Sequence, residues 1–179
     1  MKNIFFLLSL LLSQLLYSQN TTQESPIQAY GSFYEVEQTD FKTDTSHPLK
    51  VVFEVGRSFD DASKPNPLIE TAARYINMHY NAGVALKNLE VALVIHGSAS
   101  KDILKDEKYA QKNDGIKTNS NTALITALAE KGVKIILCGQ TAAYHNITKT
   151  ETLPEVEFAL SAMTALVQLQ NDGYRLISF

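Results

Sequence analysis

The chain has 179 residues, of which 45% are hydrophobic and 20% are charged. This composition is typical of a globular protein with a buried core, and it excludes disordered and collagen-like chains. The formal net charge is −3 and the 16 basic residues are scattered, so nucleic acid is not an expected partner, because phosphate binding needs a concentrated positive surface.

The first 18 residues have the features of a secretory signal peptide. Lys2 gives a basic start, an apolar run extends from Ile4 to Leu16, and the small residue Ser18 marks the expected cleavage point. The alternative is an uncleaved membrane anchor, but the run is shorter than the roughly 20 apolar residues of a membrane span. We therefore expect a periplasmic or secreted protein of a bacterial envelope, with no membrane span after cleavage.

The rest of the chain divides into a polar N-terminal extension, residues 19–48, and an α/β domain, residues 49–179. Within the extension, residues 30–36 either add an edge strand or cover one. In the domain, apolar runs predict buried strands over residues 50–55, 90–96 and 133–138. Asn66 and Pro67 have the residue types of a helix N-cap and first helical position, so a helix is predicted from there to Gly83.

Three more helices and a short helical turn are predicted between and after these strands. A charged surface helix is expected over residues 101–112, a second helix over 120–131, and a short helical turn over 140–144. Thr152 and Glu155 have the spacing of a capping box. They predict a long helix to about Asn171, which is apolar nearly all round and therefore buried in the core or against another subunit. Residues 174–179 form a predicted terminal strand.

Strands that alternate with helices predict an α/β fold with a mainly parallel sheet and helices on both faces. Right-handed crossovers place the carboxyl ends of the strands at one edge of the sheet, where ligand sites of such folds lie. Two segments reach this edge: residues 96–98 and residues 138–140.

Cys138 is the first candidate for chemistry, because it ends an apolar strand and precedes a helix. Gly139 allows a sharp turn after it, and the amide groups at the start of a helix stabilise a thiolate. Such a thiolate attacks disulfides or carries sulfane sulfur. The alternative is that Cys138 is a small buried apolar residue, as free cysteines often are. One cysteine forms neither an internal disulfide nor a structural zinc site.

His96 is the second candidate, as a base or counter-ion to Cys138 if the second and third strands are neighbours. The alternative is a strand-end histidine that is hydrogen-bonded to backbone groups. Gly97 and Ser98, like Gly139 and Gln140, are candidate ligand-binding residues at the strand ends. His145 follows in a loop that lines the same edge. No histidine or carboxylate pair has the spacing of metal ligands, so neither a metal nor a cofactor is expected.

The sequence resembles the DsrE/DsrF-like (YchN-like) family of small sulfur-relay proteins, in its exported branch. The resemblance covers roughly residues 48–179 and is carried by the order of five stretches: Val51-Val-Phe-Glu-Val, Tyr75-Ile-Asn-Met-His, Val91-Ala-Leu-Val-Ile-His-Gly, Val133-Lys-Ile-Ile-Leu-Cys-Gly-Gln, and Leu153-Pro-Glu-Val followed by Ala159-Leu-Ser-Ala-Met-Thr-Ala-Leu.

This resemblance implies a three-layer α/β/α sandwich with four or five strands and a trimer or hexamer. It also implies that Cys138 corresponds to the cysteine that carries persulfide in relay members. The leading hypothesis is thiol-based sulfur handling through Cys138, as a carrier or binding protein rather than a turnover enzyme, with a sulfane-sulfur donor or acceptor as partner. The alternative is a non-catalytic oligomeric module of the envelope that binds a ligand or serves assembly.

Overall fold

A computed structural model describes residues 24–113 and 116–179. The predicted signal peptide, residues 1–18, lies outside the described residues. Five strands form one sheet in the order β4-β3-β2-β1-β5, and every pairing is parallel. Their bounds are β1 Leu49–Val55, β2 Leu89–Ile95, β3 Lys134–Cys138, β4 Val156–Ala159 and β5 Arg175–Ile177. The three predicted internal strands and the terminal strand are thereby confirmed.

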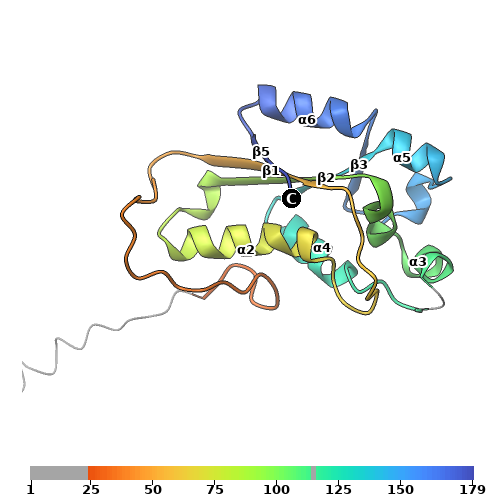
Figure 1. The fold of residues 1–179 in the computed structure, drawn as a ribbon, viewed down its shortest axis with the longest axis horizontal. Helices are drawn as coiled ribbons and strands as arrows, with labels where there is room; N and C mark the ends of the chain where they lie inside the picture. Colours follow the sequence, from red (N-terminus) through yellow and green to blue (C-terminus); the bar gives the residue numbers. More distant parts are fainter. Residues whose placement is uncertain (1–23, 114–115) are drawn as a thin grey trace, which may run out of the picture.

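Helices cover both faces of this sheet, which confirms the α/β/α fold. Figure 1 shows α2 and α4 on one face and α6 on the other, while α3 and α5 lie towards the end where the strands finish. The helix bounds are α2 Pro67–Asn81, α3 Asp106–Lys112, α4 Thr122–Glu130, α5 Gly139–Tyr144 and α6 Ala162–Asn171, and three 3-10 helices are η2 Leu86–Asn88, η3 Gly97–Ile103 and η4 Lys149–Glu151.

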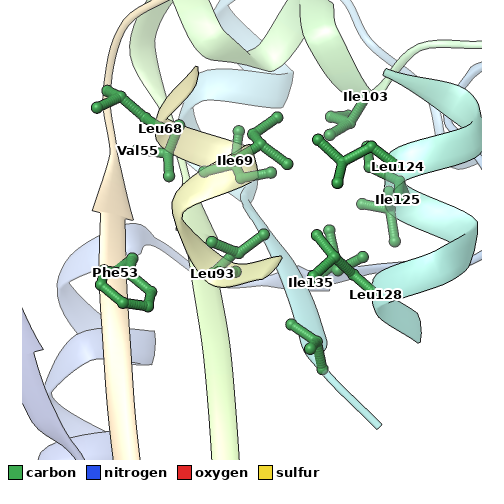
Figure 2. Close-up of a cluster of buried hydrophobic side chains, with 14 of the residues drawn as sticks. Phe53, Val55, Leu68, Ile69, Leu93, Ile103, Leu124, Ile125, Leu128 and Ile135 are labelled. Carbon is green, nitrogen blue, oxygen red and sulfur yellow. The ribbon is translucent and has the colours of Figure 1, made fainter. Parts of the chain in front are cut away.

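The main hydrophobic core lies between the sheet and the α2–α4 layer. Phe53, Leu93 and Ile135 project from three neighbouring strands into this layer, each about 1% exposed or less, and Figure 2 shows them facing the side chains of the helices. Successive side chains of a strand point to opposite faces. The alternate residues of these strands, including Val52 and Ala92, therefore point to the opposite face and pack in a second, smaller cluster beneath α6.

The helix predicted over residues 101–112 is wrong in its first half. η3 ends at Ile103, and Leu104 forms an antiparallel bridge with Thr152 before α3 begins. Both Ile103 and Leu104 are fully buried. The amide of Lys105 donates to Glu151 O at 2.8 Å, so the backbone of this segment bonds to another part of the chain instead of to its own preceding turn.

The long helix predicted from Thr152 is also wrong, because it is split into β4 and α6. Pro154 disfavours helical backbone in the residue before it, and Val156 and Phe158 have the residue types that strands favour. A capping box exists four residues earlier than expected, between Thr148 and Glu151 at the start of η4. The side chain of Ser161 then accepts from Thr164 N at 3.0 Å and begins α6.

The N-terminal extension contains no strand over residues 30–36, and this segment neither adds an edge strand nor covers one, because it packs on α2. It is attached to α2 through Asn77, a side chain only 2% exposed. The amide of Asn77 accepts from Ile27 N at 3.0 Å and donates to Ile27 O and Tyr30 O, both at 2.9 Å. Ile27 itself is buried in the main core.

Candidate functional site

Strand register brings the two predicted chemical residues, His96 and Cys138, to adjacent positions. β2 and β3 are neighbours, and their last paired residues are Ile95 and Leu137. His96 and Cys138 are the next residue on each strand, and both keep extended backbone angles. Alternation then turns both side chains to the α6 face, as it does for Glu54 of β1.

Cys138 is the N-cap residue of α5 and is 6% exposed. The hydroxyl of Thr141 and the backbone amides of Gln140, Thr141 and Ala162 lie near its sulfur and favour negative charge on it. Ala162 is the first residue of α6. The sulfur therefore lies where the amino-terminal ends of two helices meet, and both helix dipoles favour negative charge there.

These contacts decide the protonation of the thiol. Burial raises the pKa of Cys138, because a charged sulfur loses solvation. The hydrogen bonds from Thr141, Ala162 and Gln140 together outweigh this effect, and the pKa lies below its ordinary value. The arrangement therefore supports a thiolate at a lower pH than a free cysteine does.

Thr141 connects Cys138 to the neighbouring strand end. Its Oγ1 accepts a hydrogen bond from the amide of Gly97 at 3.3 Å, and its hydroxyl lies near the sulfur, where it lowers the pKa of Cys138. Sequence reasoning missed Thr141. The available signal was its position three residues after Cys138, which places it in the first turn of the helix that follows.

The two glycines of the site are needed for close backbone approach. A Cβ atom on Gly139 would lie 2.5 Å from Ala159 O, at the end of β4. Gly97 has φ of +53°, and a Cβ there would lie 2.5 Å from Gly56 O. Both residues bring strand ends together around the sulfur, which is a packing role beside the predicted ligand-binding one.

The other two predicted ligand-binding residues have partners within the chain. The Nε2 of Gln140 donates to Leu160 O at 3.4 Å, and the Oγ of Ser98 accepts from Ser58 N at 3.0 Å. Ser98 is exposed and lines a hollow together with His145, which lies beyond the far end of α5.

His96 makes its hydrogen bond on the side away from Cys138. Its Nε2 lies 2.9 Å from Oε1 of Glu54 on β1, and the ring packs against Gly56. The other carboxylate oxygen of Glu54 accepts from Ser178 Oγ at 2.9 Å. Sequence reasoning missed Glu54, although it is the one acidic residue in the apolar run of β1. The structure thus places His96 and Cys138 at adjacent strand ends on the same face of the sheet, but it pairs His96 with the carboxylate of Glu54.

Neither a metal cluster nor a membrane-crossing helix is found in the part of the chain that the structure describes. Residues 24–113 and 116–179 contain no group of three or more histidine, cysteine, aspartate or glutamate side chains that is able to hold a metal ion. None of the helices in these two ranges has the length and apolar character needed to cross a bilayer.

Comparison with known proteins identifies one matching family and two similar solved structures. The sequence model of the DsrE/DsrF-like family matches residues 62–179. A protein of unknown function from Methanobacterium thermoautotrophicum, MTH1491, has a similar structure with a TM-score of 0.55 at 14% identity, covering 73% of this chain and 99% of its own. The YchN protein of E. coli gives a TM-score of 0.47 at 14% identity with the same coverage. None of the curated proteins matches the chain.

Proposed function

Because the chain belongs to the DsrE/DsrF-like family, we propose that it handles sulfur through Cys138, which accepts sulfane sulfur as a persulfide and passes it on. The observation that carries this proposal is the position of the Cys138 sulfur at the start of α5, with the Thr141 hydroxyl and backbone amides at the starts of α5 and α6 near it. A buried cysteine that serves only packing needs no such donors, whereas a nucleophilic thiolate is stabilised by them.

The proposed step is a transfer between thiols. The Cys138 thiolate attacks the outer sulfur of a donor persulfide, R–S–SH. A new S–S bond forms at Cys138 while the S–S bond of the donor breaks, and the donor leaves as its thiolate, R–S⁻. The number of persulfides is unchanged, so the step needs neither an oxidant nor a cofactor.

His96 is the proposed proton donor to the leaving thiolate. Its Nε2 is hydrogen-bonded to Glu54, and its Nδ1 has no hydrogen-bond partner among the described residues. In this proposal Nδ1 is the atom that donates the proton to the bound ligand. Glu54 has the role of a positioning residue, because it orients the ring without reaching the sulfur.

Mass spectrometry of the intact protein tests this function. Incubation of the purified chain with glutathione persulfide is expected to add one sulfur atom at Cys138, and Cys138→Ser is expected to add none. His96→Asn is expected to form the persulfide more slowly with Cys138 still reactive. If Cys138 gains no sulfur at any pH around neutrality, the proposal is wrong.

A second candidate function is a non-catalytic oligomeric module, and the outer face of α6 favours it. Met163 and Val167 lie about one turn apart on α6 and Leu160 precedes its N-cap, and the three are 75%, 57% and 73% exposed. Apolar side chains gathered in this way are typical of an interface between subunits, and family resemblance suggests a trimer or hexamer. The double variant Met163→Lys/Val167→Lys is expected to reduce the mass in solution to that of a monomer, whereas a wild-type monomer would argue against this function.

Export to the envelope is also proposed, on the evidence of the predicted signal peptide. The mature protein recovered from the periplasm or medium is expected to begin after Ser18. Recovery of the full chain with Met1 from the cytoplasm would contradict this localisation.

A further inference from the structure

A hollow of about 170 Å³ lies beside η3 and beyond the carboxyl end of α5. Its floor is apolar, since Leu104 is fully buried and Ile147 is 7% exposed. Its rim is polar and basic, with Lys101, Lys112, His145 and two serines. An apolar floor beneath a cationic rim is suited to a ligand with an apolar body and an anionic group.

The charge of the rim is unbalanced in the described part of the chain. Four lysines are spaced along residues 101–112, and two of them have partners: Lys105 Nζ donates to Thr150 O at 2.8 Å, and Lys108 pairs with Glu151 at 2.9 Å. For the other two, Lys101 and Lys112, the described residues offer neither a hydrogen bond nor an ion pair to Nζ. These are the two lysines that line the hollow.

The nearest acidic group does not neutralise Lys101. Asp102 is 4% exposed and turns inward, where Asn66 Nδ2 donates to its Oδ2 at 2.7 Å and Ser58 Oγ donates to the same carboxylate. Its field reaches Lys101, but it forms no ion pair with that lysine. Among the described residues, the hollow therefore has two ammonium groups without an acidic partner, in a chain whose net charge is negative.

From this combination we propose that the hollow binds a small organic anion. The hollow is small, which suits a carboxylate or sulfonate with a short aliphatic body. The body packs on Leu104 and Ile147, and the anionic group lies between Lys101 and Lys112. Cys138 starts α5 and His145 follows its end, so this site is separate from the sulfur and does not depend on the proposed function.

Backbone NMR titration with butanoate tests the proposal. The amide signals of Ser98 and Ile147 are expected to shift and to saturate. Two matched probes separate the parts of the recognition: butanol keeps the apolar body without charge, and inorganic phosphate keeps the charge without the body. Each is expected to bind at least tenfold more weakly than butanoate.

Variants then localise the site. Lys101→Gln/Lys112→Gln is expected to weaken butanoate binding at least tenfold, while the control Lys87→Gln/Lys131→Gln, at exposed lysines elsewhere, leaves it unchanged. Cys138→Ser is expected to bind butanoate like the wild type. Absence of saturation, equal binding of butanol or phosphate, or equal weakening by both lysine pairs would each overturn the proposal.

Discussion

Replacing Thr141 with valine tests the electrostatics of the site most directly. The change keeps the shape of the side chain but removes the hydroxyl that accepts from Gly97 and lowers the pKa of Cys138. A hydrogen bond to a charged group contributes about 1.5–3 kcal/mol. The lower end of this range corresponds to a roughly tenfold smaller thiolate population in the variant. This holds at a pH below the pKa of Cys138 in both the wild type and the variant.

The rate falls less than the population does. A less acidic thiolate is a better nucleophile, with a Brønsted coefficient of about 0.4–0.5, which restores roughly threefold. Below the pKa of Cys138 in both proteins, the rate of its exchange with a disulfide is therefore expected to be about three- to fourfold lower in the variant. The midpoint of the pH profile of this rate is expected to move to higher pH. The sign follows because the lost donor had stabilised the charged form.

Hydroxyethyl disulfide is a suitable reagent, because it is small enough for a sulfur in a residue that is 6% exposed. Mixed-disulfide formation is followed by mass spectrometry from pH 5 to 9. Thr141→Ser is the matched control, since it retains the hydroxyl, and its profile is expected to follow the wild type. A Thr141→Val profile with the wild-type midpoint would show that the hydroxyl does not stabilise the thiolate.

Three further variants probe the surroundings of the site. Gly139→Ala places a methyl group against Ala159 O and is expected to cost about 1–3 kcal/mol of unfolding free energy in urea; an unchanged midpoint would contradict the close approach. Leu93→Ala, at the centre of the core in Figure 2, is expected to cost about 2–5 kcal/mol, and a loss below 1 kcal/mol would show a core that collapses around the gap. Burial raises the pKa of Asp102 above 3.8, so its contribution to stability is present at low pH and is lost as pH rises through its folded pKa. Wild type is therefore expected to lose stability relative to Asp102→Asn from about pH 4 upwards, and a pH-independent difference in urea midpoints would refute this.

The sequence allowed the sheet to be predicted because its three central strands are continuous apolar runs bounded by glycine. It also indicated that Cys138 ends a strand and precedes a helix. It misassigned β4, because apolar residues recur along the whole of residues 156–169, and periodicity alone does not separate a short strand followed by a helix from one long helix. It missed Thr141 and Glu54, because their roles depend on hydrogen bonds to Gly97 and His96, which are more than 40 residues away in sequence.

The pairing of β5 with β1 has a consequence for folding. Val51 pairs with Arg175, and Ser178 reaches Glu54 over a separation of 124 residues. Contacts of such long separation close slowly, because the entropy of the loop is lost before the contact forms. The strands β1 to β4 pair with partners that are nearer in sequence. The hydrogen bond from Ser178 to Glu54, the partner of His96, is therefore expected to be among the last to form.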